Sequence, residues 1–495
     1  MNDIPALVLT DFYKTDHRRQ FPDGTTLVYS NFTPRGSRLP GVDAVVFFGL
    51  QYFLLEYLGR RFDETFFRLP KDEAVGAYRR RLDHALGRGA VPLDHVEALH
   101  DLGYLPLRIK ALPEGSRVPV QVPTHTIENT DPRFAWLTNF IETMMSCVVW
   151  GPCTSATIAN RYRRTFERYA RRTGAPAAFV PWQGHDFSFR GMFGVEAACL
   201  SGAGHLLSFQ GTDTVPAIDF LERYYGADCE RETIGGSVPA TEHAVMCAGG
   251  RESELETYRR LLVDVYPRGI VSIVSDTWDF FAVVARLLPA LKKEILARDG
   301  KLVIRPDSGD PVKILVGDPE APAASPERRG LVELLWDLFG GTATAAGYRA
   351  LDPHVGAIYG DSITLERQEA ILSGLAAKGF ASSNVVLGIG SYTYQYVTRD
   401  TFGFAMKATF CTVDGEDREI YKEPRTDVKK RSHRGLIAVV RGPDGRLKAE
   451  FPVPRAVEAS DANLLRTVYE NGRVVRRTTL AEMRAVVERE LADAD

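Results

Sequence analysis

One pattern recurs between about residues 178 and 392, and it limits the possible folds more than any other feature of the chain. A short β-branched or aromatic run ends in glycine or a carboxylate, and a helical stretch follows it. Repeated alternation of this kind predicts parallel strands joined by helices. The clearest units are HLLSFQGTDTV (205–215), RGIVSIVSDTWD (268–279), GKLVIRPDSGD (300–310), HVGAIYGDSITLERQEAILSGLAAKGF (354–380) and SNVVLGIGS (383–391).

About six or seven such units in roughly 210 residues fit an α/β barrel, complete or nearly so. A doubly wound open sheet is the competing topology. In the fourth unit we expect a strand over Val355–Tyr359, an exit at Gly360 and Asp361, and a helix over Ile363–Leu375. In either topology the loops that follow the strands converge on the ligand. Those loops carry Asp213, Asp276, Arg305, Asp307, Gly360, Asp361, Gly388 and Gly390.

The two flanks have a different character. The start of the chain is β-rich (TTLVYSNFTPRGS), with helices after it, and beyond residue 400 strand-like segments are separated by DG, PDG and NG turns. We therefore expect residues 1–175 and 393–495 to form one mixed α/β domain with antiparallel strands. Residues 176–392 are expected to form the barrel-like catalytic domain.

The composition excludes several classes of protein. The chain has 495 residues, of which 25% are charged, and its net charge is only −3, which does not favour nucleic-acid or membrane-surface binding. Its six cysteines form no CxxC pair, which suits a reducing compartment. The start of the sequence lacks a signal-peptide pattern, and no run of about 18 apolar residues occurs. We expect a soluble, cytoplasmic protein with no nucleic-acid or membrane partner.

Three strand exits offer groups that bind phosphate. In IRPDSGD (304–310), Arg305 can bind a phosphate directly, and Asp307 or Asp310 can bind one through Mg²⁺. Asp-Ser-Gly is also a common turn. GDS (360–362) and GIGS (388–391) can offer backbone N–H groups. KKRSHRG (429–435) is cationic and could close over phosphates, although such runs are also solvated patches or nucleic-acid contacts. Together these segments predict a small ligand with several phosphates.

A single histidine, His243, lies in GGSVPATEHAVMCAGG (235–250). Histidine titrates near neutrality, and its neutral ring is a nucleophile toward phosphorus. Taken alone, however, a histidine beside apolar residues is more often structural. Its role therefore depends on the residues around it.

The chain resembles the nicotinamide phosphoribosyltransferase family from about residue 8 to its final helix. The resemblance is carried, in order, by TDFYKTDHRRQFPDGTTLVYSNFTPRGSR, VFFGLQYFL, HDFSFRGMFGVEAA, GTDTVPAI, SVPATEH, SIVSDTWD, IRPDSGDP, GDSIT, TRDTFGFAMKAT and YKEPRTDVKKRSHRG. It implies formation of nicotinamide mononucleotide and pyrophosphate from nicotinamide and 5-phosphoribosyl pyrophosphate in NAD biosynthesis or salvage. It further implies Mg²⁺, stimulatory ATP hydrolysis, the type II phosphoribosyltransferase fold, and a homodimer with active sites at the subunit interface.

The resemblance also implies a nicotinamide site. Phe187 and Tyr13 would sandwich the pyridine ring, with Tyr13 supplied by the partner subunit, and Arg190 would contact the base or its phosphate surroundings. Asp213 would accept the carboxamide N–H. A nicotinate carboxylate roughly 4 Å from Asp213 would be repelled by about 4 kcal/mol at an effective dielectric constant near 20, which is about a thousandfold in binding. Asp213 therefore favours nicotinamide.

Further roles follow from the same resemblance. Arg305 would hold phosphate, and Asp307 and Asp276 would act on Mg²⁺, pyrophosphate or the ribose hydroxyls. His243 would be phosphorylated by ATP, with Glu242 or Asp276 orienting its ring. The remaining residues would contact ribose and phosphates: Gly360 and Asp361 at the ribose, Gly390, Ser391 and Arg399 at the 5′-phosphate, and Lys422, Lys430, Arg431 and Arg35 over pyrophosphate or the ATP phosphates.

Two departures and three rival functions remain. GIGSY (388–392) stands where the family typically has Gly-Ser-Gly-Gly-Gly, and Ser391 and Tyr392 reach positive φ less freely than glycine. The segment 226–240 is also slightly long. The rivals are a nicotinate phosphoribosyltransferase, which Asp213 disfavours, a non-catalytic relative that binds phosphate or a nucleotide, and a nucleic-acid partner bound through KKRSHR.

Overall fold

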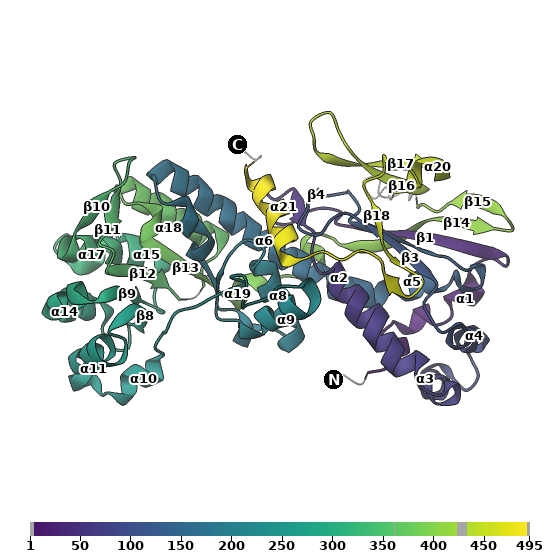
Figure 1. The fold of residues 1–495 in the computed structure, drawn as a ribbon, viewed down its shortest axis with the longest axis horizontal. Coiled ribbons are helices and arrows are strands. Elements are labelled where there is room, and N and C mark those ends of the chain that lie inside the picture. The colour runs from purple at the N-terminus through teal and green to yellow at the C-terminus, as the bar shows by residue number, and fades with distance from the viewer. Residues whose placement is uncertain (1–3, 361, 423–432, 493–495) are drawn as a thin grey trace. The chain divides into compact units, whose positions relative to one another are not determined.

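The computed structural model describes residues 4–360, 362–422 and 433–492. The chain forms two compact units, each of which is described separately (Figure 1). The first unit contains Met1–Thr157, Phe220–Ala227 and Val397–Asp495, and the second contains Ile158–Asp219 and Asp228–Tyr396.

These units differ in three places from the expected division into 1–175 with 393–495 and 176–392, because residues 158–175 and 393–396 belong to the second unit and residues 220–227 to the first. Residues 158–175 belong to the second unit, where the Tyr162 hydroxyl donates to the carbonyl oxygen of Ile363 at 2.7 Å. Residues 220–227 belong to the first unit, where the Phe220 ring packs on Tyr52 at 4.9 Å and the Tyr225 ring packs on Phe48 at 5.1 Å. Contacts between residues far apart in the sequence, which local periodicity does not reveal, account for these differences.

The second unit is built on a six-stranded parallel sheet, which confirms the predicted α/β class. Its strands lie in the order β7, β6, β13, β12, β9, β8, and most of their apolar residues are buried, as is typical of parallel sheets. Chain order and spatial order differ, so successive strands are joined by crossovers. The strands are β6 (Gly184–Asp186), β7 (Gly211–Thr212), β8 (Arg268–Val274), β9 (Asp299–Arg305), β12 (Val355–Tyr359) and β13 (Val385–Ile389).

The segment 236–241 connects the two edge strands of this sheet. Gly236 forms a parallel bridge to Gly211 of β7, and Ala240 forms one to Ser272 of β8. The Thr212 N–H donates to the Gly236 carbonyl oxygen at 2.9 Å, and the Thr241 N–H donates to that of Ser272 at 3.0 Å. The sheet is therefore curled and barrel-like rather than an open doubly wound sheet.

One predicted strand is much shorter than expected. In HLLSFQGTDTV the helix α8 (Val195–His205) extends into the segment, Leu206 and Phe209 lie in a buried turn, and only Gly211–Thr212 forms a strand. A short apolar run does not distinguish a strand from another buried conformation.

The helix of the fourth predicted strand–helix repeat (354–380) runs over Leu365–Ala377, two residues later than expected, because the Thr364 hydroxyl caps it by accepting from the Arg367 N–H.

The other helices and short strands of the second compact unit are α7 (Val180–Gln183), α9 (Val215–Tyr225, which ends in the first unit), α10 (His243–Ala248), α11 (Glu254–Arg260), α12 (Phe280–Ala282), α13 (Leu288–Ala290), α14 (Lys292–Ala297), α15 (Pro311–Val316), α16 (Pro326–Arg329), α17 (Leu331–Phe339), β10 (Gly341–Ala343), β11 (Arg349–Leu351) and α19 (Ser391–Tyr394).

The first unit contains a seven-stranded antiparallel sheet in the order β15, β14, β1, β5, β3, β18, β19. Three strands from the start of the chain (β1, β5 and β3) form the middle of this sheet, and two strands from its end flank them on each side, as expected for a domain built from the two flanks. The strands are β1 (Thr25–Thr33), β3 (Leu107–Ala111), β5 (His125–Asn129), β14 (Ala405–Val413), β15 (Glu416–Glu419), β18 (Arg466–Glu470) and β19 (Arg473–Val474).

Two of the predicted turns join strands of this sheet as hairpins. Asp414 and Gly415 join β14 to β15 with φ values of 52° and 80°, and Asn471 and Gly472 join β18 to β19 with 49° and 81°. Positive φ at both positions is the requirement of the tight hairpin turn that Asp-Gly and Asn-Gly favour.

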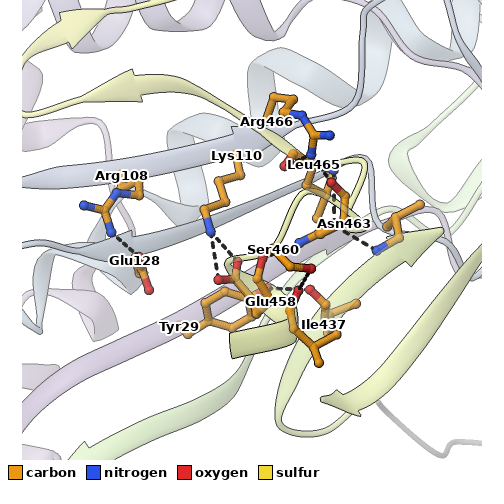
Figure 2. Close-up of polar contacts among 12 residues, drawn as sticks. Tyr29, Arg108, Lys110, Glu128, Ile437, Glu458, Ser460, Asn463, Leu465 and Arg466 are labelled. Atoms are coloured by element: carbon orange, nitrogen blue, oxygen red, sulfur yellow. Dashed lines mark hydrogen bonds and ion pairs between the residues drawn. The ribbon is translucent and has the colours of Figure 1, made fainter. Parts of the chain in front are cut away.

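A third hairpin, β16 (Leu436–Arg441) and β17 (Leu447–Val453), packs on this sheet through a largely buried polar cluster (Figure 2). Lys110 of β3 donates to both carboxylate oxygens of Glu458 at 2.8 Å. Asn463 accepts from the Val439 N–H at 3.0 Å and donates to the Glu458 carbonyl oxygen at 2.8 Å. The cluster thus fixes the chain between β17 and β18.

The first unit also contains two short paired strands, β2 (Ala44–Val46) and β4 (Arg117–Pro119). Helix α6 begins in this unit and continues into the second. Within the described ranges, no helix is both long and apolar enough to cross a membrane. The α-helices are α1 (His17–Gln20), α2 (Leu50–Tyr52), α3 (Lys71–Leu86), α4 (Asp94–Leu102), α5 (Leu137–Phe140), α6 (Glu142–Thr173), α20 (Arg455–Glu458) and α21 (Leu480–Ala492).

Candidate active site

The carboxyl ends of the parallel strands carry most of the side chains that sequence analysis singled out. Because these strands are parallel, their carboxyl ends share one edge of the sheet. The residues there are Phe187 after β6, Asp213 after β7, Asp276 after β8, Arg305 and Asp307 at the end of β9, Gly360 after β12, and Gly390 and Ser391 after β13.

Glycines at this edge allow neighbouring groups to approach closely. A Cβ atom at position 360 would lie 1.9 Å from Oδ1 of Asp307, and one at position 388 would lie 2.8 Å from the Phe187 ring. A Cβ atom at position 191 would lie 1.9 Å from Oγ of Ser391. The fold therefore brings Asp307 against Gly360, Phe187 against Gly388, and Ser391 against Gly191.

Asp213 is held by two hydrogen-bond donors. Nε2 of His185 lies 2.8 Å from its Oδ1, and the Ser237 hydroxyl donates to the same oxygen at 2.5 Å. Burial by itself would raise the pKa of Asp213, but the hydrogen bonds from His185 and Ser237 outweigh burial and lower this pKa. Asp213 is therefore an ionised hydrogen-bond acceptor at neutral pH.

The Phe187 ring packs beside the His185 ring that contacts this carboxylate. The rings of His185 and Phe187 are 4.4 Å apart with an interplanar angle of 35°. Phe187 directly follows β6 (Gly184–Asp186) and lies two positions after His185, so both side chains belong to the same strand exit. A flat ligand that stacks on Phe187 would therefore lie beside Asp213.

His243 is the first residue of α10, and its ring contacts Asp276. Its Nε2 lies 3.1 Å from Oδ1 of Asp276, while 48% of the His243 side chain is exposed. Glu242 precedes the helix, but its side chain makes no capping hydrogen bond. Of the two residues expected to orient the ring, Asp276 makes the contact.

The other carboxylate oxygen of Asp276 organises the turn after β9. Oδ2 accepts from the backbone N–H groups of Asp307 and Ser308 at 2.9 and 2.7 Å and from the Ser308 hydroxyl at 2.5 Å. Burial opposes ionisation of Asp276, but these donors and His243 lower its pKa. Asp276 therefore links the histidine to the backbone of the predicted phosphate-binding turn.

Arg305 is held at the same edge. Its Nη2 donates to the carbonyl oxygen of Thr241 at 2.8 Å, its Nε lies 3.3 Å from Oδ1 of Asp307, and 12% of its side chain is exposed. These contacts fix the guanidinium while leaving further N–H groups for an anionic ligand.

The carboxylates at this edge fit Mg²⁺ only if a ligand supplies most of the coordination. Within the described ranges, no group of three or more metal-binding side chains is found. Asp276 is occupied by protein donors, and Asp310 caps α15 by accepting from Val312 and Lys313. Mg²⁺ commonly uses one or two carboxylates together with water and substrate phosphates. Asp307 is the carboxylate that could hold such an ion, which would neutralise charge on the phosphates.

Arg190 belongs to the second unit, where it is exposed in the short helix η7 (Phe189–Gly191). Four other predicted site residues lie in the first unit: Tyr13, Arg35, Arg399 and Lys422. Tyr13 is 61% exposed and has Nζ of Lys14 5.3 Å from its ring centroid. Nε of Arg35 donates to the Gly403 carbonyl oxygen at 2.9 Å, and Arg399 and Lys422 are exposed. Asp361, Lys430 and Arg431 lie outside the described residues.

Sequence reasoning missed three side chains that contact predicted residues: His185, Ser237 and Ser308. His185 could have been found from its position two residues before Phe187, at the exit of a strand. Ser237 and Ser308 carry no comparable signal, because serine is common in loops and turns.

Comparisons with known proteins show the family to which the chain belongs. Residues 182–473 match the nicotinate phosphoribosyltransferase (NAPRTase) family, and residues 5–63 match the nicotinamide phosphoribosyltransferase N-terminal domain. The chain is 54% identical to the nicotinamide phosphoribosyltransferase of Acinetobacter baylyi over 97% of this chain and 96% of that protein. It is 35% identical to that of Xanthomonas campestris pv. campestris over 97% of each.

Two solved structures share the fold. The nicotinate-nucleotide pyrophosphorylase of Pyrococcus furiosus has a TM-score of 0.58 at 16% identity, over 99% of this chain and 97% of that one. Human nicotinic acid phosphoribosyltransferase has a TM-score of 0.52 at 18% identity, over 99% and 94%.

Proposed function

The chain belongs to the nicotinamide phosphoribosyltransferase family, and on that premise we propose that it makes nicotinamide mononucleotide and pyrophosphate from nicotinamide and 5-phosphoribosyl pyrophosphate. Family membership makes it a pentosyltransferase. The observation that carries the choice of base is the ionised Asp213 beside the Phe187 ring.

Asp213 discriminates between the two bases by charge. A carboxamide can donate an N–H to this carboxylate, whereas the carboxylate of nicotinate has no proton to donate and carries the same charge. Two unit charges roughly 4 Å apart repel by about 4 kcal/mol at an effective dielectric constant near 20. Nicotinamide is therefore the preferred base.

The transfer itself needs a positioned base and a stabilised leaving group. As the C1–O bond to pyrophosphate breaks, positive charge develops on the ribose and negative charge on the pyrophosphate. Arg305 would stabilise that negative charge, and stacking on Phe187 would align the pyridine nitrogen with C1. The nitrogen attacks with its own lone pair and carries no proton, so no protein base is required.

His243 is proposed to accept a phosphoryl group from ATP. Its Nε2 carries the proton donated to Asp276, so Nδ1 keeps a lone pair for attack on the γ-phosphorus. An N–P bond forms while the bond from phosphorus to the ADP oxygen breaks, and water later hydrolyses the phosphohistidine to phosphate. The phosphorylated state would favour substrate binding and synthesis.

Other parts of the proposal rest on the family. The enzyme would act as a homodimer in the cytoplasm, in NAD biosynthesis or salvage, with Tyr13 contributed across the subunit interface. Within the first unit, the exposure of Tyr13 is compatible with that role.

A paired turnover assay tests the function. Nicotinamide and nicotinate are supplied at equal concentration with 5-phosphoribosyl pyrophosphate and Mg²⁺, with and without ATP, and the mononucleotides are separated by chromatography. The expected product is nicotinamide mononucleotide, stimulated by ATP in wild type but not in His243→Ala. Preference for nicotinate would assign the enzyme to the nicotinate-specific reaction, and absence of product from both would favour a binding protein.

A further inference from the structure

We propose that His185 and Ser237 are positioning residues that set the preference for nicotinamide over nicotinate, by holding one oxygen of Asp213 and leaving the other for the base. This inference rests on the proposed function and extends it to two residues outside the predicted site. Neither side chain needs to touch the substrate for this role.

Both donors bind the same atom of Asp213. Nε2 of His185 and Oγ of Ser237 lie 2.8 and 2.5 Å from Oδ1. In the part of the chain that the structure describes, Oδ2 has no hydrogen-bond partner, and 43% of the Asp213 side chain is exposed. The arrangement fixes the carboxylate through one oxygen and presents the other.

The fold makes room for the His185 ring. A Cβ atom at position 211 would lie 2.8 Å from Nδ1 of His185, so Gly211 allows the ring to lie against β7. Because an ionised carboxylate only accepts hydrogen bonds, Nε2 must carry the proton. The same His185 ring also packs against Phe187. His185 therefore contacts both the ring on which the base would stack and the carboxylate that would accept the carboxamide N–H.

Ser237 is placed by the segment that joins the edge strands. The Gly236 N–H donates to the Gln210 carbonyl oxygen at 2.7 Å, and the Gly236 carbonyl oxygen accepts from Thr212 at 2.9 Å. Ser237 follows directly, and its backbone position is therefore tied to β7, which also carries Asp213. Its side chain is exposed, so its removal leaves no buried cavity.

Two donors on one oxygen affect selectivity in two ways. They stabilise the charged form of Asp213, which repels nicotinate, and they restrict the rotation of the carboxylate, so that Oδ2 meets the carboxamide N–H at little entropic cost. Loss of either donor should weaken nicotinamide binding more than nicotinate binding.

The test compares steady-state constants for Ser237→Ala and His185→Leu with those of wild type. We expect KM for nicotinamide to rise at least about tenfold, KM for 5-phosphoribosyl pyrophosphate to stay within about twofold, and the nicotinamide-to-nicotinate ratio of kcat/KM to fall by about tenfold or more. Ser237→Thr and His185→Gln keep a donor and should recover part of the ratio.

Matched controls are available outside the site. Ser373→Ala removes a hydroxyl that donates to the Ala370 carbonyl oxygen, and His354→Gln alters another histidine that contacts an aspartate, Asp352. Both controls should leave the ratio unchanged. Circular dichroism and thermal unfolding of each variant show whether it is folded.

A double-mutant cycle separates positioning from a general structural role. In an Asp213→Ala background, Ser237→Ala and His185→Leu should change KM for nicotinamide by less than about twofold, because the carboxylate they act through is absent. An unchanged ratio in the single variants, or the same fold-change with and without Asp213, would overturn the inference. If either result were found while the wild-type enzyme still made nicotinamide mononucleotide from nicotinamide, the proposed function would stand and only this inference would fall. A wild-type enzyme that prefers nicotinate would contradict both the proposed function and this inference.

Discussion

The Tyr394 hydroxyl lies 2.7 Å from Nδ1 of His205, and both side chains are buried. Nε2 of the same ring donates to the Gly211 carbonyl oxygen at 3.0 Å, so Nδ1 accepts from the tyrosine. Burial lowers the pKa of His205 to about 4, which keeps the ring neutral. Because Tyr394 ends α19 just after Gly390, this pair connects the proposed phosphate loop to the strand that precedes Asp213.

Replacing Tyr394 with phenylalanine should therefore affect stability and phosphate binding together. The change leaves Nδ1 of His205 buried without a donor, which should lower the free energy of unfolding by about 1–3 kcal/mol. KM for 5-phosphoribosyl pyrophosphate should also rise. Urea denaturation and steady-state kinetics measure the two effects. Tyr396→Phe, at a side chain that is 79% exposed, serves as the control, and equal stability of the two variants would contradict the prediction.

The contact between His243 and Asp276 predicts a selective loss of ATP stimulation. In Asp276→Asn an amide N–H can face Nε2 of His243, which favours the wrong ring tautomer, as in other carboxylate–histidine pairs. We expect the ATP-stimulated increment in synthesis to fall at least about tenfold. Asp279→Asn is a matched control, because Asp279 caps α12 and asparagine caps helices equally well. Full stimulation in Asp276→Asn would show that the contact does not matter.

The ion pair between Lys110 and Glu458 should contribute strongly to the stability of the first unit. Their side chains are only 15% and 10% exposed, and Glu128 nearby adds a second buried carboxyl whose pKa is raised by burial and by Glu458 (Figure 2). Lys110→Met leaves Glu458 without its cation and should cost about 3–5 kcal/mol in chemical denaturation.

The same substitution at Lys448, whose pair with Glu450 is about half exposed, provides the comparison for Lys110→Met. It should cost less than about 1 kcal/mol. A similar cost for both substitutions would mean that burial does not govern the strength of the Lys110 pair.

His95 should make the protein less stable in mild acid. Burial lowers its pKa to about 4 from the usual 6.5, so between these values the unfolded chain binds a proton that the native state does not. Stability from this group is complete above pH 6.5 and falls as the pH decreases toward 4. From pH 7 to 5 the loss is about 2 kcal/mol.

His95→Leu isolates this contribution, since Nδ1 of His95 is buried without a hydrogen-bond partner among the described residues. Urea denaturation at both pH values should show a smaller loss for the variant than for wild type. An equal loss in both proteins would assign the pH dependence to other groups.

The strands with the clearest local pattern could be predicted from the sequence. Val355–Tyr359 is a strand with the expected bounds, because its apolar residues are followed at once by Gly360. The run after His205 could not be assigned correctly, because Leu206 and Phe209 are equally apolar in a buried turn. Pairing of β1 with β14 joins residues almost 400 positions apart, and no local pattern encodes that register.

The residues of the candidate site likewise fall into those that the sequence predicts and those that it does not. The rule that ligands bind at the carboxyl ends of parallel strands selected Asp213, Asp276 and Arg305. The contact of Ser237 with Asp213 depends on the bridges made by residues 236–241, which are single-residue pairings without a strand-like pattern. Side chains that act on a neighbour rather than on a ligand leave little trace in a single sequence.

In the seven-stranded sheet, strands from the end of the chain flank the block of strands from its start, and this has a consequence for the order of synthesis. β14 and β18 are translated after every residue of the second unit, so that unit can complete its parallel sheet while β1 and β3 still have unpaired edges. During synthesis on the ribosome, the first unit would therefore be the first to emerge but the last to finish folding. Loss of the last 100 or so residues would leave the first unit, rather than the second, open to aggregation and proteolysis.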